Sequence, residues 1–321
     1  MLTLIPSTTL FMTTLFMGSM MVLSSPQWLF SWVGLEINML SFIPLISNNN
    51  SNMEAEAAVK YFLVQALGSS MLLLGTFVYK SNMHNLFQVT APSLIFISLL
   101  LKLGAAPLHM WFPQVMNALS WQMCILLSTW QKVAPLMLIS MFNLSPLHTL
   151  SAMIGTFIGG IGGVSQSQLR PLLAYSSIGH LGWMMAALLQ SQMLAVNYMI
   201  IYIMISISIM VSFMWANSKT RSLNELMSMP LPMMIAMMLT LLSLGGMPPF
   251  LGFFPKWSII TSMSSNGMNM LAILMLGGTL VNLFYYLSII MNMYFKKPKI
   301  FSKSYSKGAL VVSSSLTLLA A

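Results

Sequence analysis

The chain has 321 residues, of which 57% are hydrophobic and only 5% are charged. Its 13 basic residues outnumber four acidic ones and give a net charge of +9 at pH 7. Because no soluble core can bury so much apolar surface, this composition excludes an ordinary soluble enzyme and predicts a membrane protein. No pattern of basic and aromatic residues accompanies the positive charge, which argues against a nucleic-acid partner.

Apolar runs of about 20 residues, the length that crosses a hydrocarbon core, recur along the whole chain. They are continuous and do not alternate with polar residues, which favours helices over barrel strands. The sequence therefore predicts an all-α polytopic membrane protein with about 11 transmembrane helices. The expected spans are 3–23, 26–46, 56–79, 88–118, 121–143, 148–167, 171–190, 194–216, 230–265, 267–293 and 309–321.

The first and last expected spans differ from the others. Residues 1–24 have no basic n-region and no small-residue cleavage site, so we interpret them as the first span and not as a removable signal. The last expected span, 309–321, has only 13 residues, which is short for a complete crossing.

Two of the stretches, 88–118 and 230–265, are too long for one straight helix and carry Gly and Pro near their centres. Residues 100–107 read Leu-Leu-Lys-Leu-Gly-Ala-Ala-Pro and residues 241–248 read Leu-Leu-Ser-Leu-Gly-Gly-Met-Pro, so five of eight positions are identical. Each is followed by a Phe-Pro pair. A helix break that recurs in this way indicates two related halves with the working site at the interruptions, although chance similarity is the alternative in so biased a composition.

Basic residues outside the spans predict the orientation in the membrane. Loops on the opposite side from the N-terminus hold only Lys80. Those on the N-terminal side hold, or lie near, Lys60, Arg170, Lys219, Arg221, Lys296, Lys297, Lys299, Lys303 and Lys307. The N-terminal side is therefore the positive side. We expect a first five-helix repeat at 1–143, a second, inverted five-helix repeat at 148–293, and a basic loop with a C-terminal helix at 294–321.

Four ionisable residues, Glu36, Lys102, Lys132 and Lys256, fall in the middle of apolar stretches. A charged group at the bilayer centre costs about 2.5 to 3.5 kcal/mol even on the most permissive insertion scale. Lys102 adjoins the first helix break and Lys256 follows the second. Such residues usually mark a path for ions or protons. The alternative, snorkelling of the lysines toward the headgroups, fits poorly with their central placement.

Lysine suits proton transfer in this setting. Burial disfavours the charged form of an amine while a nearby carboxylate favours it, so a buried lysine can load and release a proton as its surroundings change. Glu36 paired with Lys102 is therefore a plausible trigger. His109, within the first break, and His180, within the seventh span, are further candidates for proton relay. For each histidine the alternative is a structural hydrogen bond to a neighbouring helix.

Other chemistry lacks a basis in the sequence. No dinucleotide-binding glycine motif, Walker loop or metal-ligand spacing occurs. A single cysteine, Cys124, lies in an expected helix and is interpreted as a small buried residue. The spacing of Gly155, Gly159 and Gly163 predicts a face for close helix packing, not for phosphate binding.

Taken together, the motifs resemble those of the subunit 2 family of mitochondrial NADH:ubiquinone oxidoreductase, or respiratory complex I, among the antiporter-like subunits. The resemblance runs nearly end to end. The most specific segments are Gly34–Leu40, Leu101–Pro113, Trp130–Pro135, Gln168–His180 and Ser243–Trp257. The high methionine content, 35 residues, is also common in mitochondrially encoded chains.

The resemblance implies two inverted five-helix repeats and a buried axis in which Glu36 modulates Lys102, Lys132 is the central carrier, and Lys256 leads toward the next subunit or the exit. In this alignment Ser243 stands where the first break has Lys102. Compared with bacterial relatives, the chain lacks three N-terminal helices, as animal versions do.

The same resemblance implies the setting of the protein. Its partners would be other membrane-arm subunits, including antiporter-like neighbours, and the lipid bilayer of the mitochondrial inner membrane, with the N-terminus and basic loops on the matrix side. This chain would hold no cofactor; NADH, FMN, iron-sulfur clusters and ubiquinone would be used through other subunits. Two alternatives remain: a stand-alone cation/proton antiporter of the same fold, and a structural spacer. An intramembrane pair of aspartates is missing, which favours proton-only transport.

Overall fold

The computed structural model describes residues 6–49, 51–80, 85–142, 145–216 and 231–295, and every regular element among them is a helix. The predicted all-helical fold class is thereby confirmed. The expected span at 309–321 and most of the basic loop residues, from Lys219 and Arg221 to Lys296–Lys307, lie outside the described residues. Eight helical stretches among the described residues are long and apolar enough to cross a membrane, with Trp121–Ile139 counted as one.

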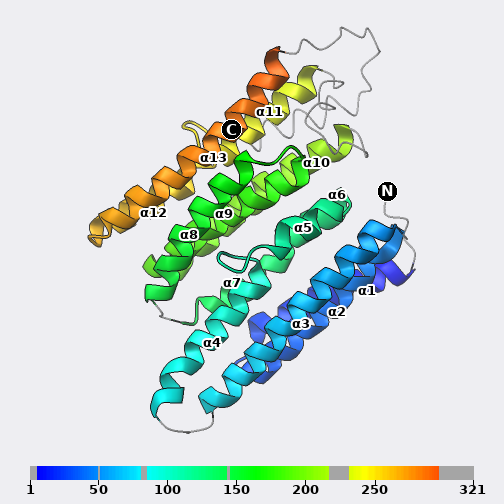
Figure 1. The fold of residues 1–321 in the computed structure, drawn as a ribbon, viewed down its shortest axis with the longest axis vertical. Helices are drawn as coiled ribbons and strands as arrows, with labels where there is room; N and C mark the ends of the chain where they lie inside the picture. The colour runs from blue at the N-terminus through cyan, green and yellow to red at the C-terminus, as the bar shows by residue number, and fades with distance from the viewer. Residues whose placement is uncertain (1–5, 50, 81–84, 143–144, 217–230, 296–321) are drawn as a thin grey trace. The chain divides into compact units, whose positions relative to one another are not determined.

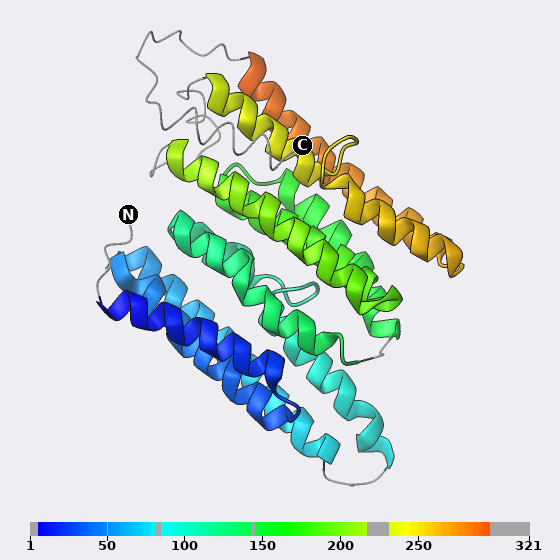
Figure 2. The ribbon, with the colours of Figure 1, turned by 180° about the vertical axis from the view of Figure 1, so that it is seen from behind.

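The chain divides into two compact units, Met1–Leu147 and His148–Ala321. In the first unit, α1, α2 and α3 lie side by side as near-parallel rods, and α4 packs against α3 and α7 (Figures 1 and 2). Its helices are α1 (Pro6–Ser24), α2 (Trp28–Ile46), the short 3-10 helix η1 (Ser47–Asn49), α3 (Asn52–Lys80), α4 (Asn85–Leu103), α5 (Trp111–Ala118), α6 (Trp121–Ser128) and α7 (Trp130–Ile139).

In the second unit, α9 is the central helix, since nearly all of its residues are buried and it contacts α10, α12 and α13. The helices of this part of the chain are α8 (Ser145–Val164), α9 (Leu169–Gln190), α10 (Gln192–Ala216), α11 (Leu231–Gly245), α12 (Phe253–Ser265) and α13 (Asn269–Phe295). Arg170, which the sequence placed in a loop, instead lies in the first turn of α9 and is only 7% exposed.

Most serine and threonine hydroxyls in the spans are satisfied within their own helix. Ser98 Oγ donates to Ile95 O at 2.7 Å, and Ser212 Oγ donates to Ile209 O at 2.6 Å, the pattern that lets a hydroxyl sit in an apolar medium without an outside partner. A serine in a span is therefore not by itself a sign of a polar path.

Glycines set the closest helix contacts, as predicted for the face of Gly155, Gly159 and Gly163. A Cβ on Gly159 would lie 2.6 Å from the backbone N of Gly179, so α8 and α9 touch backbone to backbone. In the first unit, a Cβ on Gly18 would lie 2.9 Å from the carbonyl oxygen of Gly34. Without a hydrophobic force between helices in lipid, such close approach supplies the packing energy.

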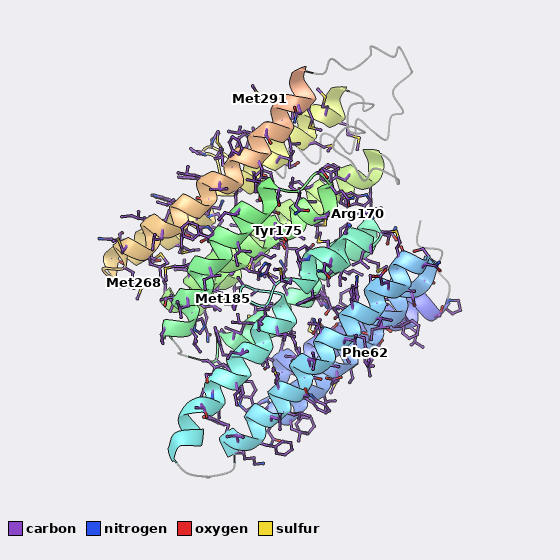
Figure 3. The ribbon with its side chains drawn as sticks, in the orientation of Figure 1. Phe62, Arg170, Tyr175, Met185, Met268 and Met291 are labelled. Carbon is purple, nitrogen blue, oxygen red and sulfur yellow. The ribbon has the colours of Figure 1, made fainter. Side chains whose placement is uncertain are left out.

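Large apolar side chains cover the outside of both units. Phe62 of α3 and Met291 of α13, both labelled in Figure 3, are 41% and 49% exposed. Because lipid tails solvate such side chains, these faces fit the bilayer environment that the sequence predicts.

Both long stretches are interrupted as predicted, α4 from α5 and α11 from α12. A third interruption was not predicted: the expected single span at 121–143 is divided at Thr129, between α6 and α7. Thr129 Oγ1 donates to Ile125 O at 2.6 Å, and the backbone N–H of Thr129 donates to the same oxygen. This double donation closes the end of α6.

Candidate functional site

The first break is a closed turn at the end of α4. Gly104 has a φ of +67°, a conformation that favours glycine, and the backbone N–H groups of Gly104 and Ala105 donate to the carbonyls of Leu101 and Leu100. Trp111 Nε1 adds a bond to Leu101 O at 3.0 Å. Lys102 is thereby fixed in the last turn of α4, where the helix dipole favours a positive charge.

Lys102 forms an ion pair with a carboxylate from another helix. Its Nζ lies 3.9 Å from Glu36 Oε1 of α2, and the two side chains are 2% and 19% exposed. Neither of these two atoms makes a hydrogen bond with any residue that the structure describes. A pair held at this distance in so dry a place carries a large desolvation cost that only partial Coulomb attraction offsets.

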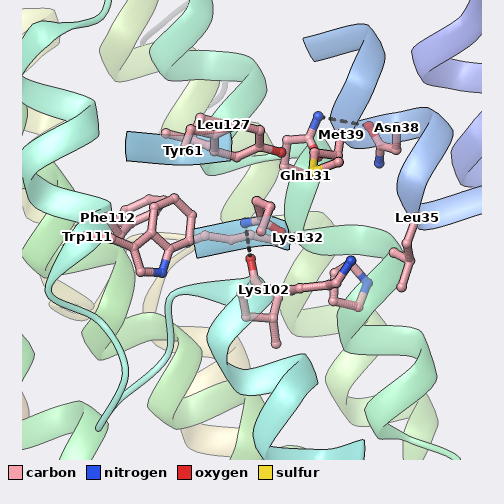
Figure 4. Close-up of a pocket in the computed structure, with 13 residues that line it drawn as sticks. Leu35, Asn38, Met39, Tyr61, Lys102, Trp111, Phe112, Leu127, Gln131 and Lys132 are labelled. Carbon is pink, nitrogen blue, oxygen red and sulfur yellow. Dashed lines mark hydrogen bonds between the residues drawn. The ribbon is translucent and has the colours of Figure 1, made fainter. Parts of the chain in front are cut away.

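A small cavity of about 20 Å³ adjoins this pair, and both Lys102 and Lys132 line it (Figure 4). That volume holds about one water molecule. The other polar lining residues are Asn38, Tyr61, Gln65 and Gln131. Gln65 Nε2 donates to the backbone carbonyl of Lys102 at 3.1 Å, and Gln131 Nε2 donates to Asn38 Oδ1 at 2.9 Å. The two lysines thus share one polar, water-sized space.

Lys132 lies in the first turn of α7, directly after the unpredicted interruption at Thr129. It is 1% exposed, and its Nζ lies 5.1 Å from the centre of the Phe112 ring, a cation–π geometry. The break in the helix and the aromatic face together hold this amine in the interior, where snorkelling to the headgroups is excluded by its burial.

The second break holds Lys256. Its Nζ donates to the carbonyl of Gly245, the last residue of α11, at 2.9 Å. Gly246 has a φ of +77°, and a Cβ on it would lie 2.7 Å from Lys256 Nζ. Lys256, which belongs to α12, therefore satisfies a carbonyl at the C-terminal end of α11. Its amine occupies the space that a side chain at position 246 would fill.

The two breaks have the same backbone geometry, but their structural alignment is shifted by one residue from the alignment that the sequence predicted. The positive-φ glycines are Gly104 and Gly246, not Gly104 and Gly245. The bond from Ala105 N to Leu100 O corresponds to that from Met247 N to Leu242 O. The counterpart of Lys102 is therefore Leu244, and the assignment of Ser243 to that place was wrong.

The two candidate histidines are both buried. His109 is 6% exposed, and its Nδ1 lies 3.0 Å from Pro107 O, so this nitrogen carries the hydrogen. It does not line the cavity shared by the lysines. In the second unit, His180 is 8% exposed, and its Nδ1 lies 2.8 Å from the Tyr198 hydroxyl.

The structure therefore brings Glu36, Lys102 and Lys132 together in the first unit, while Lys256 and His180 lie in the second. The sequence reasoning missed the neutral polar residues of the cavity, Asn38, Tyr61, Gln65 and Gln131. The spacing of Tyr61 and Gln65, four residues apart on α3, was the available signal.

Comparison with known proteins identifies the family of the chain. The family model described as NADH:quinone oxidoreductase/Mrp antiporter, TM, matches residues 25–282. The chain belongs to this family. Among curated relatives, NADH-ubiquinone oxidoreductase chain 2 of Anopheles gambiae is 42% identical over 293 residues, which cover 88% of this chain and 84% of the relative. The same protein of Aedes aegypti is 40% identical, with 95% and 92% covered.

Solved structures of other membrane complexes contain chains with the same fold. A chain of respiratory complex I from Thermus thermophilus aligns with a TM-score of 0.83 at 22% identity, covering 98% of this chain and 77% of that one. A chain of the Mrp complex from Dietzia sp. aligns with a TM-score of 0.82 at 18% identity, covering 93% and 63%. At these identities the likeness establishes the fold alone.

Proposed function

We propose that the chain is a proton-translocating membrane-arm subunit of NADH:ubiquinone oxidoreductase in the mitochondrial inner membrane, with its N-terminus and basic loops on the matrix side. Quinone reduction takes place in other subunits and drives proton movement here. The observation that carries the proposal is the buried Glu36–Lys102 pair beside a water-sized cavity that also contains Lys132.

Glu36 acts as the switch in this proposal. While its carboxylate stays near Lys102, the ammonium form of the lysine is favoured. When the carboxylate moves away, desolvation favours the neutral amine, and the proton passes through the cavity toward Lys132. The distance of 3.9 Å is too long for a hydrogen bond, so the two groups can approach or separate without breaking such a bond between them.

Lys132 is the central carrier, and Lys256 stands on the way to the exit or to the next subunit. The carbonyl of Gly245 and the negative end of α11 stabilise the ammonium form of Lys256. Release of the proton then requires Lys256 to leave this carbonyl. His109 and His180 are kept as candidate relays.

The test is Lys132→Met in the assembled enzyme in sealed membranes. We expect NADH:ubiquinone turnover and proton pumping per assembled enzyme to fall about tenfold or more, since a positioned proton-transfer group is lost. Lys60→Met is the matched control, because Lys60 is 46% exposed and pairs with Glu56 on the surface of α3. Normal pumping and turnover in Lys132→Met would reject the carrier role.

A stand-alone cation/proton antiporter is the second candidate, favoured by the shared fold with a chain of the Mrp complex. Reconstitution of the purified chain separates the two candidates, since autonomous exchange of Na⁺ or K⁺ for protons would support the antiporter.

A further inference from the structure

The second unit contains a buried polar cluster around His180, and apart from this histidine its members have no place in the proposed lysine path. Three helices contribute to it, and each of its side chains is at most 8% exposed. Its members are Ser176, Ser177 and His180 of α9, Tyr198, Tyr202 and Ser206 of α10, and Asn282, Tyr285 and Tyr286 of α13. Hydroxyl and amide groups in an apolar interior cost free energy unless they gain partners or a function.

One end of the cluster is His180. Its Nδ1 lies 2.8 Å from the Tyr198 hydroxyl, and the centre of its ring lies 5.2 Å from that of Tyr202. Tyr202 in turn interacts with the hydroxyl of Ser177, one helical turn before His180. The imidazole thus stands among hydroxyl groups that can each donate and accept a hydrogen bond.

The middle of the cluster contains two adjacent tyrosines and, beside Ser176, a small cavity that these two tyrosines do not line. The rings of Tyr285 and Tyr286 lie 4.5 Å apart, and both hydroxyls interact electrostatically with Ser176. Yet neither tyrosine hydroxyl makes a hydrogen bond of normal length to any described residue. A cavity of about 10 Å³, close to the volume that one water needs, is lined by Ser176, Tyr202 and Ser206.

The other end of the cluster reaches the second helix break. Leu244, the penultimate residue of α11, lines the same cavity. The position of a Cβ on Gly245 lies 3.6 Å from Cδ2 of Tyr286, so this tyrosine packs against Gly245. The carbonyl of Gly245 is the group that accepts the hydrogen bond from Lys256 Nζ. The cluster therefore extends from His180 to the residue that binds the amine.

We propose that Tyr198, Tyr202, Ser176 and Tyr286, with one water in the cavity, relay protons between His180 and Lys256, starting from the contact of His180 Nδ1 with the Tyr198 hydroxyl. This inference rests on the proposed function. Each hydroxyl accepts a proton from one neighbour and passes its own to the next, so the O–H bond broken on one side is replaced by one formed on the other. No tyrosine changes its charge over a full transfer. One proton leaves His180, and one arrives at Lys256 after it has left the Gly245 carbonyl.

A purely structural role, polar contacts that hold α9, α10 and α13 together, makes a different prediction. Removing such a contact would lower the amount of assembled enzyme, whereas removing a relay hydroxyl would lower the turnover of each enzyme that does assemble. Phenylalanine keeps the ring packing and deletes only the hydroxyl, so it separates the two roles.

The experiment therefore introduces Tyr202→Phe and Tyr286→Phe into the assembled enzyme in sealed membranes, with Tyr175→Phe as the control. Tyr175 lies on α9, is only part-buried, and packs its ring against Gly162 of α8. Native gels give the amount of enzyme, and NADH:ubiquinone turnover and proton pumping are measured per enzyme. We expect both cluster variants to lose about two- to tenfold in turnover and pumping, the effect of one hydrogen bond, while the control keeps both.

Lys256→Met, measured in parallel, distinguishes the failures. If it lowers turnover while both cluster variants keep normal turnover per enzyme, the relay is wrong and the proposed function stands. If Lys256→Met is also normal, the use of Lys256 in the proposed path is wrong as well. Reduced assembly with normal turnover per enzyme in the cluster variants would assign these tyrosines a structural role and overturn the relay.

Discussion

Gly246→Ala tests the geometry that holds Lys256. A Cβ on Gly246 would lie 2.7 Å from Lys256 Nζ and 3.0 Å from its Cδ, and the φ of +77° is one that alanine rarely adopts. The backbone conformation costs about 1 to 2 kcal/mol for a residue with a Cβ. Because the crowded atoms belong to the end of a flexible side chain, the lysine moves away and loses its bond to Gly245. A hydrogen bond from a charged group is worth about 1.5 to 3 kcal/mol.

Gly267→Ala is a matched control for this substitution. Gly267 has a φ of +73°, and nothing lies within 4 Å of the position of its Cβ. It therefore carries the backbone cost without any effect on a lysine. We expect both variants to lower the thermal stability of the assembled enzyme, with the larger loss in Gly246→Ala.

Turnover separates the two variants more clearly than stability does. In Gly246→Ala, turnover and pumping per assembled enzyme should fall toward the level of Lys256→Met, while Gly267→Ala should keep the values of the unmodified enzyme. Native gels and NADH:ubiquinone assays on the same membranes measure both quantities. Equal turnover in the two glycine variants would refute the positioning of Lys256 by Gly246.

Two further substitutions test the first unit and the packing of the second. Glu36→Gln keeps the side-chain volume but removes the charge 3.9 Å from Lys102, so coupled turnover should fall severalfold, whereas Glu56→Gln on the surface should leave it unchanged. Gly159→Ala places a Cβ 2.6 Å from backbone and should destabilise the chain by about 1 to 3 kcal/mol and reduce assembly. Gly277→Ala, with nothing within 4 Å, should assemble normally; the reverse order would contradict the close helix contact.

The sequence predicted the features that composition and strong helix breakers control. Apolar length located most helices within a few residues, and glycine with proline located both long interruptions. The interruption at Thr129 escaped because threonine is compatible with a helix and the segment 121–139 contains its only proline at Pro135, inside α7. The two bonds from Thr129 to Ile125 O at the end of α6 show no pattern in the sequence.

Neutral polar residues were the main omission at the site. Tyrosine counts as hydrophobic in a composition, so the cluster of Tyr202, Tyr285 and Tyr286 looked like ordinary span residues. Serines gave no signal either, because a serine in a transmembrane helix can bond to a carbonyl of its own helix. Ser176 and Ser177 both do so, three residues back. Only the packing of three helices shows that these groups face one another.

The correct alignment of the two breaks could not be predicted from the sequence either. Counting identities aligned Lys102 with Ser243, because a run of leucines matches itself in more than one register. The backbone aligns Lys102 with Leu244 instead, since the positive-φ glycine and the turn hydrogen bonds fix the frame.

With this alignment, the two units carry their lysines on different sides of the break. In the first unit, Lys102 is part of the last turn of α4; in the second, the equivalent Leu244 has no charge, and Lys256 reaches the end of α11 from the following helix. Both solutions place a lysine at the negative end of an interrupted helix, where the helix dipole favours a positive charge. Only Lys256 also donates to a backbone carbonyl there, that of Gly245. A variant that moves the lysine to the equivalent place, Leu244→Lys with Lys256→Met, should therefore restore part of the turnover lost in Lys256→Met alone. No recovery, with normal assembly, would show that the bond to Gly245 matters and not the helix end as such.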